Sequence, residues 1–177
     1  MLIYLVGFMG SGKSTIGKIV AKKLGFRFID LDDVIESLHN MPIGDIFKTK
    51  GEDYFRSEER MTLQHLPSDE NIIISTGGGC PCYFENMNWM NDHGITIYLD
   101  AHYGILYSRL HLEKKTRPLI AKFTDIELME YILDVLPGRQ TFYKKSKLTI
   151  EIKQETPDEL AVKMISALKL MKSFSDQ

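Results

Sequence analysis

Cysteine is nearly absent from this sequence, which contains only two among its 177 residues. Cys80 and Cys82 are separated by one residue, a spacing too tight for an ordinary structural disulfide. The sequence has no second cysteine pair that would complete a zinc site. We therefore interpret both side chains as reduced thiols, which are typical of a reducing cytosol.

The sequence also lacks a marked excess of either charge. It has 22 basic and 24 acidic residues, a formal net charge of −2 and a pI near 6.2. The lack of a global positive field argues against a nucleic-acid-binding protein held by bulk electrostatics. The apolar run at residues 2–6 is too short to span a bilayer, and no basic segment or small-residue cleavage site accompanies it. We expect a cytoplasmic protein that binds neither nucleic acid nor membranes.

Strand and helix patterns alternate along the chain, whose length fits one domain, residues 1–177. Short apolar runs predict strands at 2–6, 27–30, 71–75, 96–99 and 148–152. Helical spacing of apolar residues predicts helices at 13–24, 54–66 and 126–136, and Thr156 begins a capping box before the last helix. Such alternation gives a parallel sheet covered by helices on both faces, with ligands beyond the carboxyl ends of its strands.

A basic segment at residues 113–124 joins two predicted helices and has only a weak structural signal. It contains Lys114, Lys115, Arg117 and Lys122. A connection of this length and charge is either a solvated loop or a mobile lid.

The strongest functional signal is GFMGSGKS at residues 7–14, which matches the phosphate-binding pattern G-x-x-x-x-G-K-[ST] between a predicted strand and a predicted helix. Its glycines let the backbone wrap closely around phosphate groups. Lys13 is placed to reach the β- and γ-phosphates of a nucleotide, and the Ser14 hydroxyl to bind Mg²⁺. The amides that form the cradle belong to Gly10, Ser11, Gly12, Lys13, Ser14 and Thr15.

Two carboxylates follow the second predicted strand. Asp30 and Asp32 are two residues apart, so in an extended segment both side chains would share one face and point into one site. A kinase needs one carboxylate near its metal and another near the acceptor hydroxyl. The alternative is that these residues, with Asp33, cap and open a helix, because residues 34–38 have a helical pattern.

Three consecutive glycines stand in the sequence STGGG at residues 75–79, directly after the third predicted strand. Glycines in a row weaken a strand and allow a ligand to approach the backbone closely. The alternative is a tight turn between a strand and a helix, which usually needs only one or two glycines.

Isolated arginines supply a weaker signal. Arg56, Arg117 and Arg139 have guanidinium groups that match the geometry of carboxylates and phosphates. A single surface arginine is more often solvated or paired, and Arg56 can pair with Glu52 or Glu59 on its own helix.

Taken together, these motifs resemble those of the shikimate kinase family over nearly the whole chain. The family pattern combines a P-loop, F-x-D-x-D, a phenylalanine and arginine on the next helix, S-T-G-G-G, an R-P-L motif and R-x-x-x-Y. The sequence has all six in this order, at residues 7–14, 28–32, 55–56, 75–79, 117–119 and 139–143. Six ordered motifs are far more specific than a P-loop, which indicates only a nucleotide site.

The resemblance implies a three-layer α/β/α P-loop NTPase fold. Its five-stranded parallel sheet would have the order 2-3-1-4-5, with a lid at residues 113–124 and a substrate-binding helical segment at residues 31–60. The implied activity is Mg-ATP-dependent phosphorylation of the 3-hydroxyl of shikimate, in the biosynthesis of chorismate and aromatic amino acids. ATP and shikimate are then the small-molecule partners, Mg²⁺ is the cofactor, and we expect a monomer.

The resemblance also implies roles for the matched positions in catalysis. Asp32 resembles the carboxylate that orients or deprotonates the acceptor hydroxyl. Lys13 contacts the transferred phosphoryl group, and Arg117 resembles the lid arginine that swings onto the ATP phosphates. Asp30 resembles the residue held near Mg²⁺ through water, beside Ser14.

Binding roles are implied in the same way. The acceptor would be held by the side chains of Arg56, Arg139, Phe47 and Phe55 and by the amides of Gly78 and Gly79. Adenine would lie between Arg109 and Pro157. Two departures from the family are Gln154 and Glu155, where a basic residue is common, and the sequence CPC at residues 80–82, to which we assign no function.

Two other classes of function remain open from the sequence. A small P-loop kinase acting on gluconate or a nucleoside monophosphate would share the P-loop, the sheet and the lid. The carboxylate pair, the triple glycine and the arginines suit a small hydroxylated carboxylic acid better. A non-catalytic nucleotide-binding module is the second alternative, although the sequence has no N-K-x-D motif for reading guanine.

Overall fold

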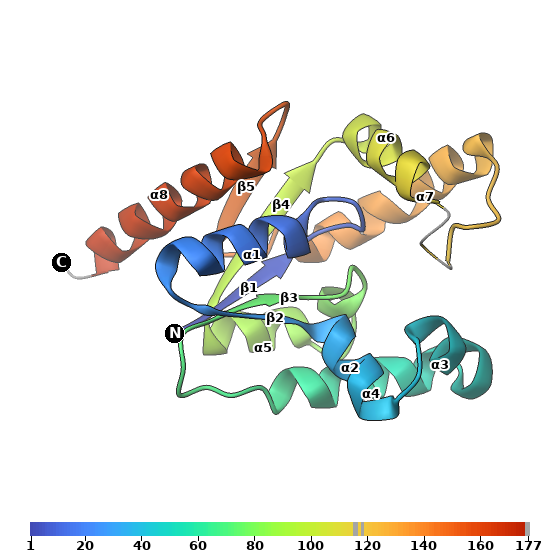
Figure 1. Ribbon diagram of the computed structural model, residues 1–177, viewed down its shortest axis with the longest axis horizontal. Helices are drawn as coiled ribbons and strands as arrows, with labels where there is room; N and C mark the ends of the chain where they lie inside the picture. Colours follow the sequence, from blue (N-terminus) through green and yellow to red (C-terminus); the bar gives the residue numbers. More distant parts are fainter. Residues whose placement is uncertain (115–116, 118, 176–177) are drawn as a thin grey trace.

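A parallel sheet of five strands organises the described residues (Figure 1). The structure is a computed structural model that describes residues 1–114, 117 and 119–175. Its elements in chain order are β1 (Leu2–Val6), α1 (Lys13–Leu24), β2 (Arg27–Asp30), α2 (Leu31–His39), α3 (Ile43–Lys50), α4 (Glu52–Gln64), β3 (Ile72–Ser75), the 3₁₀ turn η1 (Cys80–Cys82), α5 (Asn86–His93), β4 (Ile95–Ala101), α6 (Tyr103–Glu113), α7 (Asp125–Tyr143), β5 (Leu148–Ile152) and α8 (Pro157–Ser175).

The strand order β2-β3-β1-β4-β5, with every neighbouring pair parallel, confirms the predicted topology. β1 lies at the centre, where Leu5 is in register with Ser75 of β3 and Ile97 of β4. All residues of β1 and β3 are buried, because both faces of the sheet are covered, and these strands therefore have continuous apolar sequences. The carboxyl ends of β1, β2 and β3 meet at one edge, where the site described below is formed.

Helices cover both faces of the sheet and give the molecule three layers. Leu5 of β1 points toward α1, since a β-carbon on Gly17 of α1 would lie 2.9 Å from its Cδ1 atom. Its neighbour Tyr4 points to the opposite face, where its ring centroid lies 6.1 Å from that of Trp89 on α5. α8 packs beside α1, as Figure 1 shows.

Four elements differ from the sequence-based expectation at their ends, and one of them is β3, which begins one residue after the predicted start. α4 begins two residues before the predicted start, and β4 extends beyond its predicted range at both ends. α7 continues through Pro137 and Gly138, although both residues disfavour a helix interior. The continuation buries Tyr143, whose ring centroid lies 5.3 Å from that of Tyr98. Packing therefore outweighs local propensity here, and it places Arg139 on a helix.

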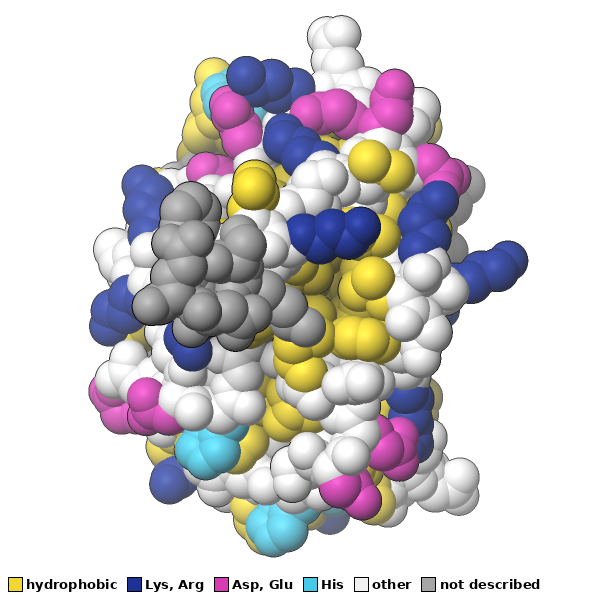
Figure 2. All heavy atoms as spheres, turned by 90° about the vertical axis from the view of Figure 1, so that its left-hand side faces the viewer, with side chains coloured by type: hydrophobic (Ala, Val, Ile, Leu, Met, Phe, Trp, Pro, Cys, Tyr) yellow, Lys and Arg dark blue, Asp and Glu magenta, His cyan; other side chains and the backbone are white. Residues whose placement is uncertain are grey.

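The face at the amino ends of the strands lies opposite the P-loop and is shown in Figure 2. Apolar side chains gather near its centre, and lysine and arginine side chains alternate with acidic ones around them. Within residues 1–114, 117 and 119–175, no helix is both long and apolar enough to cross a membrane.

Gly94, between α5 and β4, tests how tightly the central strands are packed. A β-carbon at this position would lie 2.5 Å from the backbone oxygen of Leu2, which cannot move without disturbing β1. We expect Gly94→Ala to lower the free energy of unfolding by about 1–3 kcal/mol, measured by urea denaturation. Gly138→Ala is the control, because open space surrounds that position on α7. It should leave stability unchanged or raise it by about 0.5–1 kcal/mol, and equal losses in both variants would contradict the packing argument.

Candidate active site

The loop between β1 and α1 has the shape of a phosphate-binding cradle. Gly7, Gly10 and Gly12 adopt positive φ angles of 144°, 77° and 93°. A β-carbon on Gly7 would also lie 2.9 Å from the carbonyl oxygen of Leu99, so that space as well as conformation requires glycine there. The loop leads into the N-terminus of α1, where the amides of the first turn and the helix dipole favour an anion.

Lys13, the first residue of α1, is buried and folds back onto the loop. Its Nζ donates hydrogen bonds to the carbonyl oxygens of Gly7 at 2.8 Å and Phe8 at 3.0 Å. Burial lowers the pKa of Lys13 to about 8, while the charges of Asp32 and Asp30 oppose that shift. The ammonium group therefore remains largely protonated at neutral pH and lies beside the cradle.

Asp30 caps α2 and binds Ser14 at the same time. Its Oδ1 accepts a hydrogen bond from the amide of Asp32 at 3.2 Å, and its Oδ2 accepts one from the Ser14 hydroxyl at 2.6 Å. The Ser14 Oγ also lies 3.1 Å from the Oγ of Ser75, at the end of β3. These side chains form a group of hard oxygen donors, the type that Mg²⁺ prefers.

Asp30 and Asp32 line one cavity, but the predicted reason for this is wrong. Asp30 is extended, whereas α2 begins at Leu31, so Asp32 lies in the first helical turn together with Asp33. Strand alternation therefore does not apply, and the tight N-cap turn brings both carboxylates to the same space. Helix capping and a place in the cavity, which were alternatives from the sequence, occur together.

Asp32 faces the cavity without a compensating contact for one of its oxygens. Its Oδ1 is shielded from solvent and has no hydrogen-bond partner among the residues described. Burial, followed by the charge of Asp30, raises the pKa of Asp32 to about 6. Such an oxygen can accept a proton or a hydrogen bond from a bound hydroxyl group.

The first glycine after β3 leaves room for two carboxylates. A β-carbon on Gly77 would lie 2.6 Å from Oε1 of Glu59 and 2.9 Å from Oδ1 of Asp32. Glu59, on α4, is fully buried, and burial raises its pKa to about 7 although the charge of Arg56 opposes the shift. Its Oε1, like Oδ1 of Asp32, is buried without a partner within the described part of the chain.

The next two glycines leave room for two arginines. A β-carbon on Gly78 would lie 3.3 Å from Nη1 of Arg139, and one on Gly79 would lie between 2.6 and 2.8 Å from the guanidinium atoms of Arg56. Arg56 and Arg139 therefore approach neighbouring residues of one loop from different helices, α4 and α7. The tight turn that was one alternative for the triple glycine is present, since the Cys80 amide donates to the Gly77 carbonyl at 3.1 Å where the chain enters η1. Charged side chains also approach these glycines closely, and the approach of a ligand stays a prediction.

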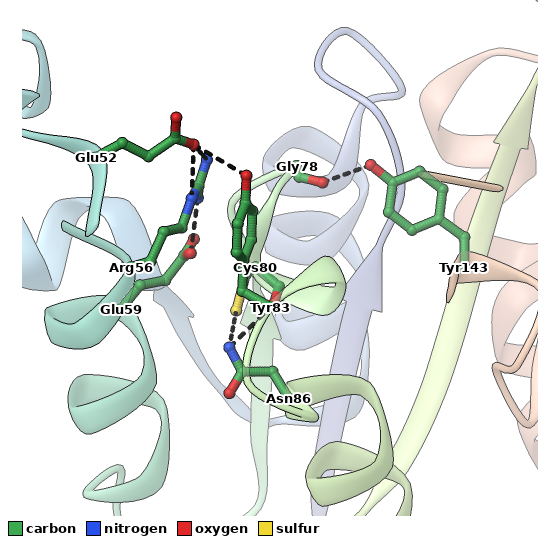
Figure 3. A network of polar contacts seen from close by, with 8 residues as sticks. All are labelled: Glu52, Arg56, Glu59, Gly78, Cys80, Tyr83, Asn86 and Tyr143. Carbon is green, nitrogen blue, oxygen red and sulfur yellow. Dashed lines mark hydrogen bonds and ion pairs between the residues drawn. The ribbon is translucent and has the colours of Figure 1, made fainter. Parts of the chain in front are cut away.

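Arg56 is buried in acidic and aromatic surroundings (Figure 3). Its Nη1 donates to Oε2 of Glu59 at 2.8 Å, while Nε and Nη2 donate to Oε1 of Glu52 at 3.2 and 3.1 Å. Its Cζ lies 5.1 Å from the ring centroid of Phe55 and 5.7 Å from that of Phe47. The sequence allowed Arg56 to pair with Glu52 or Glu59 on its own helix, and both ion pairs are present. The guanidinium group nevertheless lies against Gly79 of the glycine loop.

Arg139 lies on the other side of the glycine loop, on α7. Its Cζ lies 5.5 Å from the ring centroid of Phe8 in the P-loop. Tyr143, one helical turn further on, donates a hydrogen bond from its hydroxyl to the Gly78 carbonyl, as Figure 3 shows. α7 therefore carries the Arg139 guanidinium group, and through Tyr143 it also binds the backbone of Gly78, against which Arg139 packs.

A cavity of about 490 Å³ extends from the cradle to the start of α8. Arg109 of α6 borders it and donates from Nη1 to the carbonyl oxygens of Gly10 at 3.1 Å and Ser11 at 3.2 Å. Arg117 also borders it and pairs with Glu113 at 2.6 Å. Of the expected lid, residues 115, 116 and 118 lie outside the described residues. The cavity lining includes the predicted residues Gly10, Gly12, Lys13, Ser14, Thr15, Asp30, Asp32, Gly78, Arg109, Arg117 and Pro157.

The remaining predicted residues do not border this cavity. Gly79, Arg56, Arg139, Phe47 and Phe55 gather around the adjacent glycine loop. Ser11 contributes backbone to the P-loop, but it is buried and is not part of the cavity lining.

Three residues at this site were missed from the sequence. Glu59 is spaced to pair with Arg56 on one helix, and this spacing was the available signal for it. Ser75 belongs to the STGGG motif, in which only the glycines were given a role. Tyr143 closes the R-x-x-x-Y motif, but its bond to Gly78 joins residues 65 apart, and nothing in the local sequence indicates that contact.

The fold and this arrangement of a P-loop, a carboxylate and two arginines define a P-loop kinase of small molecules. Comparison with known proteins gives the particular family. A family model described as shikimate kinase matches residues 9–169. The chain belongs to the shikimate kinase family.

Individual relatives agree with this assignment. The shikimate kinase of Phocaeicola vulgatus is 44% identical over 145 residues, which cover 82% of this chain and 83% of the relative. The crystal structure of shikimate kinase from Bacteroides thetaiotaomicron matches with a TM-score of 0.90 at 36% identity, over 96% of this chain and 98% of that one. Shikimate kinase from Acinetobacter baumannii in complex with shikimate matches with a TM-score of 0.85 at 32% identity, over 97% and 94% of the two chains.

The raised pKa of Asp32 predicts a pH-dependent change in stability. Because this pKa is higher in the folded than in the unfolded protein, the carboxylate lowers stability progressively as pH rises from about 4 to about 6, and by a constant amount above that range. We expect Asp32→Asn to raise the free energy of unfolding by about 1–3 kcal/mol above about pH 6 and to leave it unchanged below about pH 4. Urea denaturation at a series of pH values measures the difference.

The matched control for this prediction is Asp33→Asn, since Asp33 lies in the same helical turn but is exposed. Its gain should be much smaller than that of Asp32→Asn. If Asp32→Asn raises the free energy of unfolding by the same amount at every pH, the charge of Asp32 is not the cause of the increase.

Proposed function

We propose that this protein transfers the γ-phosphoryl group of Mg-ATP to the 3-hydroxyl of shikimate, giving shikimate 3-phosphate and ADP for the biosynthesis of chorismate and aromatic amino acids. Membership of the shikimate kinase family supports this activity. The observation that carries the proposal is the arrangement around residues 77–79, where two carboxylates and two guanidinium groups face consecutive glycines beside the P-loop. That arrangement suits a small acid with both a carboxylate and hydroxyl groups.

In this proposal Arg56 and Arg139 bind the carboxylate of the acceptor. They approach the glycine loop from two different helices, so together they fix the direction in which the acceptor ring points. The amides of Gly78 and Gly79, the glycines that these arginines approach, would supply further donors. Phe47 and Phe55, whose ring centroids are 4.6 Å apart, form the apolar wall beside the ring.

Asp32 orients the acceptor hydroxyl and accepts its proton. Its pKa of about 6 leaves it ionised in most molecules at neutral pH, yet basic enough to take up a proton during transfer. Its Oδ1, which has no partner among the described residues, supports this role because a bound hydroxyl could supply the missing contact. Phosphoryl transfer depends mainly on such positioning and on stabilisation of charge.

Lys13 and Arg117 stabilise the charge of the transferred group, and the amides of residues 10–15 bind the phosphates. Arg109 and Pro157 hold the adenine. The oxygens of Ser14 and Asp30 fit a Mg²⁺ ion, with Asp30 acting through water, and the bound ion would neutralise negative charge on the ATP phosphates. Lys13 leaves its present carbonyl partners, Gly7 and Phe8, to contact the phosphates.

The proposal extends to the organisation and setting of the enzyme. The chain is a single kinase domain, in which residues 31–60 bind the acceptor and residues 113–124 form a lid that excludes water during transfer. We propose that it acts as a monomer in the cytoplasm, on ATP and shikimate, without nucleic acid or membrane partners.

The activity is tested by measuring ADP release from Mg-ATP with shikimate, gluconate, AMP or no acceptor. Shikimate alone should stimulate release strongly, and Asp32→Asn should lower the stimulated rate by on the order of a hundredfold or more, since the hydroxyl loses its proton acceptor. Stimulation by gluconate or AMP instead would assign another acceptor to the same fold. Bound ATP without stimulation by any acceptor would favour a non-catalytic module.

The role of the arginine pair is tested by Arg139→Ala. We expect acceptor binding to weaken by about 2–5 kcal/mol, seen as a raised KM for shikimate with little change in the KM for ATP. Arg27→Ala is the matched control, because Arg27 is exposed on β2 and pairs only loosely with Glu70 at 3.7 Å. An unchanged KM for shikimate in the Arg139 variant would remove this residue from the acceptor site.

A further inference from the structure

The segment that follows η1 has an unusual backbone. Phe84 and Glu85 adopt φ angles of 49° and 60°, in the left-handed region that bulky residues rarely occupy. Two consecutive residues in this conformation persist only where surrounding contacts hold them, and such strain concentrates at binding sites. Only η1 and Tyr83 separate this segment from the glycine loop of the proposed acceptor site.

Contacts on both sides hold this segment in place. The Asn86 side chain is buried and donates to the carbonyl oxygen of Cys80 at 3.0 Å, as Figure 3 shows. The backbone N–H of Asn86 donates to the Tyr83 carbonyl at 2.9 Å. The guanidinium carbon of Arg60 on α4 lies 5.6 Å from the Phe84 ring centroid. The result is that the Tyr83 ring projects toward α4 and Arg56.

Tyr83 contacts Arg56 directly through its ring and indirectly through Glu52. Its ring centroid lies 4.5 Å from Cζ of Arg56, closer than either phenylalanine ring. Its hydroxyl donates to Oε1 of Glu52 at 3.1 Å, the same oxygen that accepts from Nε and Nη2 of Arg56. The ring therefore covers the guanidinium group, and the hydroxyl fixes the carboxylate that the group binds (Figure 3).

The described contacts leave part of the guanidinium group available. Arginine has five N–H donors. Two N–H groups of Arg56 point to Glu52 and one to Glu59. The two remaining N–H groups belong to Nη1 and Nη2, which lie against Gly79, and the guanidinium group also interacts with the Tyr83 hydroxyl.

We propose that Tyr83 is a positioning residue of the acceptor site, which together with Glu52 holds the guanidinium plane of Arg56 so that its remaining N–H groups face the acceptor carboxylate. This inference rests on the proposed role of Arg56 in binding that carboxylate. A long side chain that is fixed before binding loses less conformational freedom when the acceptor arrives, so affinity is gained without direct contact by Tyr83.

The first test compares Tyr83→Ala and Tyr83→Phe with wild type in steady-state kinetics. Loss of the ring over a cation should raise the KM for shikimate about tenfold, and loss of the hydroxyl alone about threefold. The KM for ATP and kcat should stay within about twofold, because the P-loop and Asp32 are untouched. Tyr103 supplies the matched control, since it is 43% exposed against 38% for Tyr83 and lies at the start of α6. Tyr103→Ala and Tyr103→Phe should change neither KM.

The second test uses an acceptor without the charge that Arg56 binds. The inhibition constant of shikimate methyl ester should differ by less than about twofold between wild type and Tyr83→Ala, whereas competitive analogues with the free carboxylate should lose about tenfold. Equal losses for the ester and the acid would show a general change of loop structure and overturn the proposal. If Tyr83→Ala fails to fold, Tyr83→Phe tests the proposal in its place, because it keeps the ring and is expected to raise the KM for shikimate about threefold.

Arg56→Ala in the same assay separates this inference from the function on which it rests. If Arg56→Ala raises the KM for shikimate and Tyr83→Ala does not, the positioning role of Tyr83 is wrong while the acceptor site stands. If Arg56→Ala has no effect on that KM, the assignment of Arg56 is wrong and the inference falls with it. A wild-type protein that is not stimulated by shikimate would overturn the proposed function itself.

Discussion

Close approach of charged side chains to a backbone without β-carbons is the constraint on which the rest of the site depends. Gly77 admits the carboxylates of Asp32 and Glu59, and the two following glycines admit one arginine each. These four side chains come from three helices, α2, α4 and α7, which are distant in sequence. A single added methyl group in the loop would collide with these side chains, so the requirement for glycine is one of space more than of conformation.

The same convergence concentrates opposite charges where water is excluded. Burial raises the pKa values of Asp32 and Glu59, and the arginines only partly offset that cost. Buried oxygens without partners, such as Oδ1 of Asp32 and Oε1 of Glu59, are unfavourable for folding. The hydrophobic sheet beneath the loop, with β1 and β3 fully buried, provides the stability that allows this arrangement.

The sequence predicted the strands, the P-loop and the motif positions because each depends on local pattern or on residues close together along the chain. The strand order pairs residues that are distant along the chain, such as Leu2 and Ile72, and it was implied only by the resemblance to the shikimate kinase family. It did not predict how Asp32 reaches the cavity, since the start of α2 at Leu31 replaces strand geometry with a helical turn. It also did not predict α7 beyond Pro137, where burial of Tyr143 against the sheet outweighs local propensity. The Tyr83 bond to Glu52 spans 31 residues and could not be found from spacing alone.

Arg56 shows why ion pairing and ligand binding are not true alternatives for an arginine. From the sequence, pairing with Glu52 or Glu59 was the ordinary explanation of this residue, and binding of a carboxylate was the functional one. The guanidinium group has enough donors for both, and its acidic partners keep it fixed and charged before a ligand arrives. Without those partners, an arginine buried between aromatic rings would carry an uncompensated charge, and the protein would be less stable for it. The pairing on α4 is therefore a condition for placing a cation at this site.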